Sequence, residues 1–306
     1  MSIDMRDAFF NGVYDVVRRD KNVMVLTADH GAFGLTQIEK EFPKQFLNVG
    51  IAEQNMLSVA AGLAHCGKTV YAYSINNFIT MRSLEQVNID LCGMNLNVNL
   101  IGVGAGFTYS TDGPTHQGMQ DMQVMSVLPG LSVYNVTDEV NSRKLAEMAY
   151  SSEGPKYFRI EKGKKKKIYD YGEDFSQGVS KLSHSSRAYI ISTGFMTHTA
   201  LAVAKKFQDI GVVDVYRIKP LNERRLVEIL EGVETVITLE EGTYPGGLGE
   251  KVGSLLAKNR INCSFLPIAV EDKPCFHYGT REMLHQKYLI DEGSVCKKIE
   301  NFLGKA

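Results

Sequence analysis

The sequence is poor in cysteine and has no tryptophan among its 306 residues. Its five cysteines are an odd number and include no Cys-x-x-Cys pair: Cys66, Cys92, Cys263, Cys275 and Cys296. This pattern argues against a disulfide framework and against a zinc site, and it indicates a reducing compartment.

The sequence also shows no excess of charge of one sign, no long apolar run and no signal-peptide pattern. The 34 lysines and arginines balance 35 aspartates and glutamates, so no global field attracts nucleic acid or a membrane surface. No stretch reaches the ~18 apolar residues that a membrane helix needs. The N-terminal MSIDMRDAFF lacks the apolar segment of a signal peptide. We therefore expect a cytoplasmic protein that binds neither nucleic acid nor membranes.

What the chain does contain is typical of a globular α/β protein. Its hydrophobic share of 44% and charged share of 23% are ordinary, and its length suggests about two domains. Apolar runs alternate with helical patterns, which predicts a parallel sheet with helices on both faces. The first set of predicted strands is 22–27, 46–49, 69–73, 97–103, 131–136 and 156–160, and the helices between them are 5–19, 53–67, 78–91, 119–127 and 139–150.

A polar stretch then interrupts this alternation. It opens with the basic run Lys162-Gly163-Lys164-Lys165-Lys166-Lys167, which is short and flanked by acids, so we interpret it as part of a solvated linker. A second alternation of strands and helices follows from about residue 187. The sequence thus predicts two parallel-sheet α/β domains in series, at 1–165 and 186–306, joined by a linker at 166–185.

Glu53 is a carboxylate placed where a short apolar strand turns into a helix of small and apolar residues. That helix carries no charge from Met56 to Ala64, so we expect it to be buried on every side. The acid at its head has two interpretations: an exposed first-turn charge favoured by the helix dipole, or a partly buried acid aimed at a ligand.

A second segment favours the ligand interpretation. The stretch Asp112-Gly113-Pro114-Thr115-His116-Gln117-Gly118 holds an acid, a histidine and an amide within six residues of a Gly/Pro-punctuated loop. Loops of this kind on a rigid scaffold often carry chemistry.

Together these two segments resemble the transketolase family, including deoxyxylulose-phosphate synthase, where a G-I-x-E motif and a D-G-x-T-H-Q motif lie about this far apart. The resemblance runs from Met5 to the C-terminus. The G-D-G...N motif, through which complete transketolases hold magnesium and the diphosphate of thiamine diphosphate, is absent from this sequence. The resemblance therefore implies the pyrimidine-binding and C-terminal domains of a split transketolase. The magnesium ligands are then expected on a separate N-terminal subunit and none in this chain, and the assembly is expected to be a heterotetramer.

The resemblance also implies how this chain meets the cofactor. Glu53 hydrogen-bonds a ring nitrogen of the aminopyrimidine, which favours the imino tautomer that deprotonates the reactive thiazolium carbon. Phe78 stacks on the pyrimidine and Arg82 lines the site, as in the family segment F-x-x-x-R-x-x-(D/E)-Q, although the alignment here can slip by one position. Asp29, after the first strand, is expected to contact the cofactor as well.

Three residues of the second motif are implied to act on the sugar. His116 matches the histidine that relays protons to and from a substrate oxygen, a task suited to a side chain that titrates near neutrality. Asp112 corresponds to an acid that contacts a substrate hydroxyl, and Gln117 beside His116 orients the substrate.

The phosphate end of the substrate site departs from the family pattern. Arg6 matches the family arginine, but the second arginine falls at Lys162, which binds phosphate as a point charge without a fork. The family serine falls at Phe33 and a family histidine at Gly104. An unusual or nucleotide-linked sugar therefore stays open as the acceptor.

The resulting prediction is thiamine-diphosphate-dependent transfer of a two-carbon ketol unit from a ketose to an aldose. The alternatives are the beta subunit of a 2-oxo acid dehydrogenase, a pyruvate-using synthase, and a non-catalytic subunit on the same fold. The Gly-rich stretch 242–249 lacks the G-x-G-x-x-G spacing and is interpreted as a turn that enters a helix. The sequence leaves open the sugar donor and acceptor, the identity of the partner and the pathway.

Overall fold

The computed structural model describes residues 3–304, and these residues divide into two compact units. The first contains the described residues up to 105 together with 124–173, and the second contains 106–123 together with 174–304. The segment that carries the His116 motif therefore belongs to the second unit, although its neighbours in the sequence on both sides belong to the first. No helix within residues 3–304 is long and apolar enough to cross a membrane.

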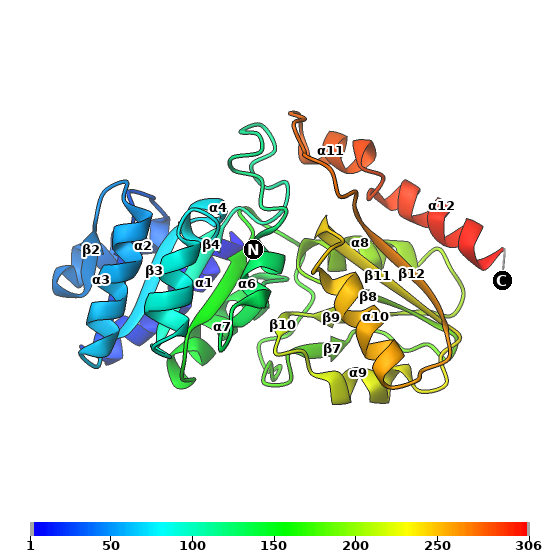
Figure 1. Ribbon diagram of the computed structural model, residues 1–306, viewed down its shortest axis with the longest axis horizontal. Coiled ribbons are helices and arrows are strands. Elements are labelled where there is room, and N and C mark those ends of the chain that lie inside the picture. The colour runs from blue at the N-terminus through cyan, green and yellow to red at the C-terminus, as the bar shows by residue number, and fades with distance from the viewer. Residues whose placement is uncertain (1–2, 305–306) are drawn as a thin grey trace. The chain divides into compact units, whose positions relative to one another are not determined.

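The first unit is built on a parallel sheet with the strand order β5-β6-β4-β3-β1-β2 (Figure 1). Its strands are β1 (Val23–Thr27), β2 (Phe46–Asn48), β3 (Thr69–Ile75), β4 (Val98–Val103), β5 (Ser132–Asn135) and β6 (Lys156–Ile160). Its longer helices are α1 (Met5–Arg19), α2 (Phe33–Glu41), α3 (Glu53–His65) and α7 (Glu139–Ser151). The short helix α6 (Asp121–Val127) begins in the second unit and ends in the first. The strands β3, β4 and β6 are almost wholly buried, as their continuous apolar runs require in a sheet covered on both faces.

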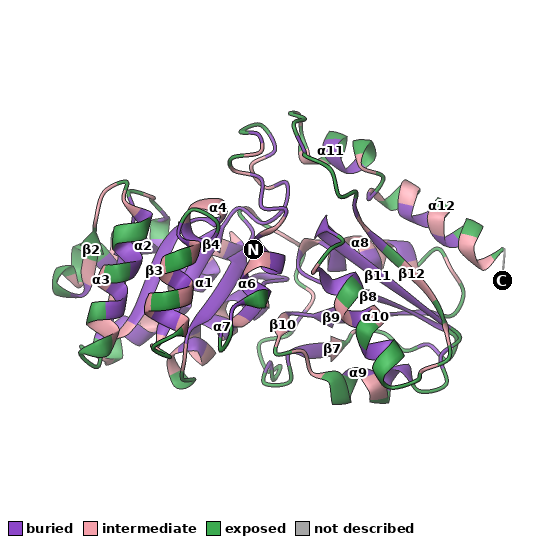
Figure 2. Ribbon diagram, viewed as in Figure 1, coloured by how far each residue is buried: buried purple, intermediate pink, exposed green. Residues whose placement is uncertain are grey.

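The second unit holds a smaller sheet with the order β12-β11-β8-β9-β7, in which β7 runs antiparallel to its neighbour and the other pairs are parallel. Its strands are β7 (Val179–Lys181), β8 (Ala188–Ser192), β9 (Ile210–Val215), β11 (Thr235–Thr243) and β12 (Ser264–Val270). The short strand β10 (Arg217–Lys219) is not part of this smaller sheet. Its helices are α8 (Phe195–Ala204), α9 (Glu223–Leu230), α10 (Leu248–Lys258), α11 (Arg281–Lys287) and α12 (Glu292–Leu303). Figure 2 shows buried strands in both units beside helices whose outward faces are exposed.

The predicted fold class, two mostly parallel α/β sheets in series, is confirmed. The bounds of the linker stay a prediction, but parts of the segment 166–185 make specific hydrogen bonds or form a strand. Buried Asp138 caps α7 and also accepts hydrogen bonds from the backbone N–H groups of Ile168 and Tyr169, at 2.7 and 2.9 Å. Strand β7 lies in its later part.

The helix predicted over 78–91 is wrong in its continuity. The structure has α4 (Asn76–Ile79), a turn, α5 (Leu84–Gln86) and then the π-helix η2 (Val87–Cys92). The Thr80 hydroxyl donates to the Asn76 carbonyl and the Ser83 hydroxyl to the Phe78 carbonyl, at 2.7 and 3.0 Å. Such side-chain bonds compete with the regular helical ladder, so the chain turns here instead of continuing as one helix.

The expectation that the Glu53 helix is buried on every side is also wrong. One face of α3 is buried through Met56, Leu57, Ala60 and Ala61, whereas Ser58 and Gly62 on the other face are exposed. The helix lacks charge but is not surrounded by protein in this chain. The sequence analysis also assigned no helix to residues 33–41 or 223–230, where α2 and α9 lie.

Candidate active site

The predicted cofactor residues of the first unit gather at one edge of its sheet. Because all its strands run parallel, the residues that follow the strands meet at the carboxyl edge, where ligands of open α/β sheets usually bind. The residues that follow strands in this way are Asp29 after β1, Glu53 after β2, Phe78 after β3 and Lys162 after β6.

Glu53 is the buried acid of this edge. It is the first residue of α3, and its side chain is only 2% exposed. The Arg82 guanidinium donates to its Oε2 at 2.9 Å, and the Ser74 hydroxyl lies 3.4 Å from its Oε1. Of the two interpretations of Glu53, the exposed first-turn charge is therefore excluded. The acid is buried and contacts the side chains of Arg82 and Ser74.

Phe78 and Arg82 stand beside this acid. The Arg82 guanidinium carbon lies 3.8 Å from the centre of the Phe78 ring, within the range of a cation–π contact. Ile79 is fully buried in the core. Of this pair, Phe78 is the residue in contact with Arg82, and its stacking role stays a prediction.

Two further residues of the edge were missed by the sequence analysis. His30 holds its Nδ1 at 2.7 Å from the Ala28 carbonyl and 3.4 Å from the Ser74 hydroxyl, and its ring centre is 6.2 Å from that of Phe78. Ser74 therefore stands between His30 and the Glu53 carboxyl. No signal in the sequence marks Ser74, but His30 directly follows the predicted residue Asp29.

Asp29 has a structural task in the same edge. Its backbone is left-handed with φ of 59°, and its N–H and carboxylate both contact the Asn48 side chain, at 3.1 and 3.3 Å. The Asn48 side-chain oxygen also accepts from the Gly50 N–H at 3.0 Å. These contacts tie the end of β1 to the turn that delivers Glu53, and Asp29 itself remains exposed.

The two predicted phosphate-binding cations belong to neighbouring segments. Arg6 is in the first turn of α1, next to Asp4, whose carboxylate accepts from the Gly163 N–H at 2.8 Å. The Met5 N–H in turn donates to the Gly163 carbonyl at 3.1 Å. Lys162 precedes Gly163 and is exposed, so the start of α1 and the end of β6 bring Arg6 and Lys162 to the same part of the unit.

The His116 loop is built within the second unit. The His116 Nδ1 lies 2.9 Å from the Thr115 hydroxyl, and the N–H groups of His116 and Gln117 both donate to the Gly113 carbonyl at 3.0 Å. Gln117 is buried and its amide donates to the carbonyls of Ser110 and His277, at 3.3 and 3.1 Å. Gln117 thus fastens the loop to the segment before α11, while Asp112 is exposed at the loop surface.

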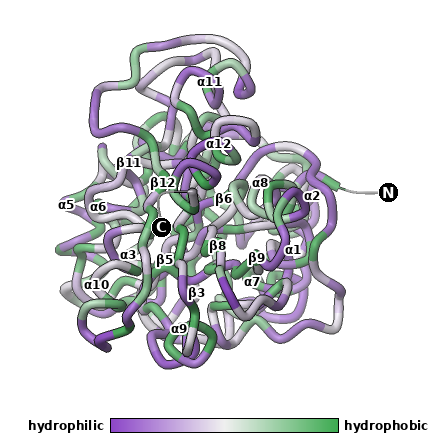
Figure 3. The backbone as a smooth tube through the Cα atoms, turned by 90° about the vertical axis from the view of Figure 1, so that its right-hand side faces the viewer, coloured by the Kyte–Doolittle hydropathy of each residue, from purple (hydrophilic) through white to green (hydrophobic). Residues whose placement is uncertain are grey.

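A buried ionic cluster under this loop was not predicted. Glu241 of β11 accepts hydrogen bonds from Arg281 (Nε, 3.0 Å) and from His285 (Nε2, 2.5 Å) of α11. Although burial raises the pKa of the Glu241 carboxyl, Arg281 and His285 outweigh this and hold the pKa well below its usual range. A side chain at Gly106, where φ is +53°, would collide with the Glu241 carboxylate, so the loop rests directly on the cluster. The segment around α11 is largely hydrophilic (Figure 3), and this cluster helps hold it to the sheet.

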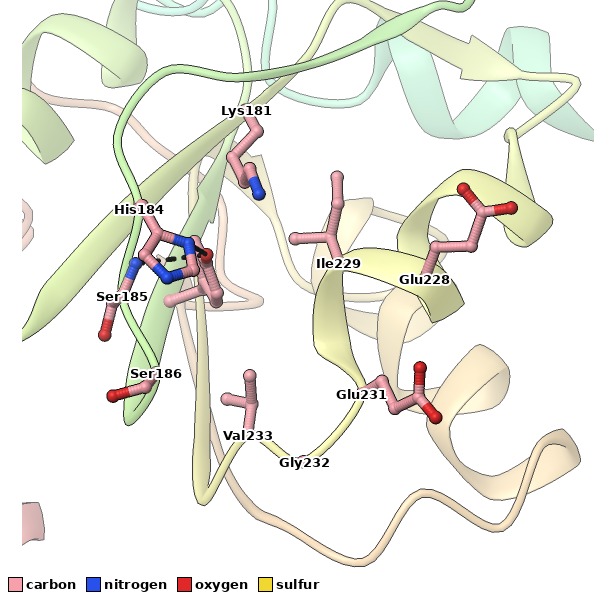
Figure 4. A pocket seen from close by; sticks show the side chains of 10 residues that line it. Lys181, His184, Ser185, Ser186, Glu228, Ile229, Glu231, Gly232 and Val233 are labelled. Atoms are coloured by element: carbon pink, nitrogen blue, oxygen red, sulfur yellow. Dashed lines mark hydrogen bonds between the residues drawn. The ribbon is translucent and has the colours of Figure 1, made fainter.

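A separate pocket of about 470 Å³ lies elsewhere in the second unit. Figure 4 shows His184 and Ser185 on one side of it, and Glu228 and Glu231 on the other. It lies beside the residues that precede β8 and β11, at the amino ends of these strands and not at the carboxyl ends that α/β sheets use for ligands. It contains none of the predicted site residues.

Within residues 3–304, no group of three or more His, Cys, Asp or Glu side chains is placed to hold a metal ion.

Comparison with known proteins agrees with this arrangement. The family described as transketolase, pyrimidine binding domain, matches residues 1–167, and the transketolase C-terminal domain family matches residues 178–295. The chain belongs to the transketolase family. Within it, the chain is a subunit of the split type and a transketolase-like transferase, which confirms the family and the reaction class predicted from the sequence.

Individual relatives cover nearly the whole chain. It is 30% identical to one of the subunits of apulose-4-phosphate transketolase from Phocaeicola vulgatus, over 99% of this chain and 98% of that protein. It is 29% identical to the 6-deoxy-6-sulfo-D-fructose transketolase subunit SqwH of a Clostridium species, over 93% and 89% of the two chains. A solved structure described as a split gene transketolase, inactive β4 tetramer, is 29% identical and superposes with a TM-score of 0.87 over 99% of both chains. These relatives favour ketol transfer over the dehydrogenase and synthase alternatives.

Proposed function

We propose that this chain supplies the pyrimidine half of a thiamine-diphosphate site, and that a separate N-terminal subunit supplies magnesium and the diphosphate site. The observation that carries the proposal is a buried carboxyl, Glu53, beside the face of an aromatic ring, Phe78, at the carboxyl edge of the sheet.

The residues present fit the pyrimidine end of the cofactor. An aminopyrimidine is flat and polar at its rim, so it needs an apolar face and a hydrogen-bonding acid at its edge. Phe78 offers the face and Glu53 the acid, and both already contact one flat, hydrogen-bonding group, the Arg82 guanidinium. When bound, thiamine diphosphate supplies the nucleophilic carbon that accepts the two-carbon fragment.

Each of the predicted site residues then has a defined role. Glu53 shares a proton with the pyrimidine ring nitrogen, in a site dry enough to strengthen that hydrogen bond. Phe78 orients the ring, and Asp29 fixes the turn beside it through Asn48. His116 exchanges a proton with a substrate oxygen, and Asp112 contacts a substrate hydroxyl.

We further propose that the sugar carries an anionic end bound by Arg6 and Lys162. The relatives described above are named for a phosphorylated sugar and for a sulfonated one, and both groups are anions. The placement of Arg6 and Lys162 on adjoining segments supports this assignment. Gln117 contributes by holding the loop that presents His116.

The assembly we propose is a heterotetramer of two copies of each subunit, located in the cytoplasm. The relative described as an inactive β4 tetramer supports self-association of chains of this kind. All five cysteines are free thiols, which is compatible with a reducing compartment.

The test is reconstitution. The purified chain, incubated with thiamine diphosphate, magnesium and a ketose, should show no turnover, and adding the subunit with the G-D-G...N motif should restore ketol transfer to an aldose. Tight cofactor binding and turnover by this chain alone would overturn the split arrangement. Ferricyanide reduction with pyruvate but not with a ketose would overturn ketol transfer.

A further inference from the structure

Arg82 makes an unusual pair of contacts at the centre of the candidate site. One guanidinium nitrogen donates to the Glu53 Oε2 at 2.9 Å, and the guanidinium carbon lies 3.8 Å from the centre of the Phe78 ring. A single flat group therefore covers the ring and hydrogen-bonds the acid at the same time.

The proposed function assigns the same two contacts to the aminopyrimidine ring. Only one flat group at a time can lie over the face of Phe78 that Arg82 now covers. Arg82 also occupies Oε2, one of the two Glu53 oxygens that could accept a hydrogen bond. We infer that Arg82 occupies the contacts that the aminopyrimidine needs, and that its side chain must turn away before the cofactor binds. This inference rests on the proposed function.

The structure limits the movement to the side chain. The Arg82 carbonyl accepts from the Gln54 amide at 3.1 Å, and the Arg82 N–H donates to the Asn77 carbonyl at 3.1 Å. The backbone is therefore fixed at both polar groups. The Arg82 side chain is 44% exposed, so a change of rotamer releases the guanidinium into water.

There is also a physical reason for such a placeholder. A buried carboxylate without a counter-charge is costly, and Glu53 is only 2% exposed. Arg82 supplies this counter-charge. Because Arg82 is half exposed, its ion pair and ring contact are both weak enough for a ligand to displace. The Oε2 atom of Glu53 becomes available to the pyrimidine only after this donor has left.

The experiment measures binding of thiamine to the full chain by saturation-transfer NMR, a method suited to millimolar affinities and independent of turnover. Arg82→Met removes the flat charged head and keeps most of the stem. We expect it to bind thiamine about 3- to 10-fold more tightly than the wild type, because no competitor is left. Raising the salt should strengthen binding to the wild type by screening the Arg82–Glu53 pair, and should not strengthen binding to Arg82→Met.

Arg19→Met is the matched control. Arg19 also lies over an aromatic ring, Tyr150 at 4.9 Å, in the same unit. It should leave the affinity unchanged. If Arg82→Met unfolds, Arg82→Lys keeps the charge but loses the flat face, and we expect it to tighten binding by a smaller factor.

Weaker or unchanged thiamine binding in the folded Arg82 variant would overturn the inference and make Arg82 a simple binding residue. If Glu53→Gln and Phe78→Ala still weaken binding in that case, the proposed function survives. No binding by any variant would overturn the proposed site together with the inference.

Discussion

Replacement of Glu53 by glutamine separates a catalytic acid from a structural one. Glutamine keeps the volume of the side chain and removes its charge and its ability to share a proton. The direct structural loss is the ion pair with Arg82, whose side chain is 44% exposed, so water can solvate the guanidinium that remains. We therefore expect a loss of about 1 kcal/mol of stability, which corresponds to about 2–4 °C in melting temperature.

The expected loss of activity is much larger. A positioned proton-transfer group contributes about 10²- to 10⁴-fold to a rate. A stability change of about 1 kcal/mol alters an equilibrium only about fivefold, so destabilisation cannot produce such a loss. Ketol transfer by Glu53→Gln, reconstituted with the N-terminal subunit, thiamine diphosphate and magnesium, should fall at least about 100-fold.

Glu39→Gln provides the comparison, because Glu39 is an exposed acid on α2 in the same unit. It should retain full activity. If Glu53→Gln retained activity within a few-fold of the wild type, the acid would have no part in the reaction. A subunit that is only structural would then be the correct interpretation.

Three further perturbations have defined outcomes. Burial lowers the pKa of Lys156 to about 8 from an ordinary 10.5. Between these two pH values the unfolded chain binds more protons than the folded chain, so the free energy of unfolding rises with pH. Urea unfolding should show that this rise in stability is lost in Lys156→Met. An equal rise in the variant and the wild type would contradict a lowered pKa of Lys156. Because Arg281 and His285 hold the pKa of Glu241 low, Glu241 contributes stability above its ordinary pKa that is lost as the pH falls below about 4.5. Glu241→Gln should cost about 3–5 kcal/mol at pH 7, with the difference narrowing in acid; a constant difference from pH 7 to pH 3 would refute this. His116→Ala should lower reconstituted ketol transfer about 100-fold with an unchanged melting temperature, and unchanged kcat would remove His116 from the reaction.

The sequence was sufficient for the features that follow from strand order. The resemblance of the motifs implied Glu53 and Phe78 as site residues, and the parallel sheet, which brings the residues after its strands to one edge, explains why they lie together. The same logic places Asp29 and Lys162 at that edge. The roles of these residues were implied by the motifs, and the strand pattern alone would not have marked them.

Features set by one or two particular side-chain contacts could not be predicted. The break after Ile79 depends on hydroxyl bonds of Thr80 and Ser83 to particular carbonyls. The cluster of Glu241 and His285 joins residues 44 positions apart. Neither has a periodic signature, because one or two hydrogen bonds decide the outcome. The exposed face of α3 was missed because small apolar residues suit both a buried helix and one left open in an isolated chain.

The departures from the family pattern at the phosphate end are built into the backbone. Gly104 stands where the family has a histidine, and its φ is +109°, a conformation that L side chains rarely adopt. Phe33 stands where the family has a serine, and a phenylalanine has no hydroxyl to offer a ligand. Because neither position can supply a directional hydrogen bond from a side chain, the cations Arg6 and Lys162 remain to hold an anionic group. A lysine binds as a point charge, with little demand on geometry. If the proposed roles of Arg6 and Lys162 hold, this end of the site selects its substrate by charge more than by the shape of a phosphate.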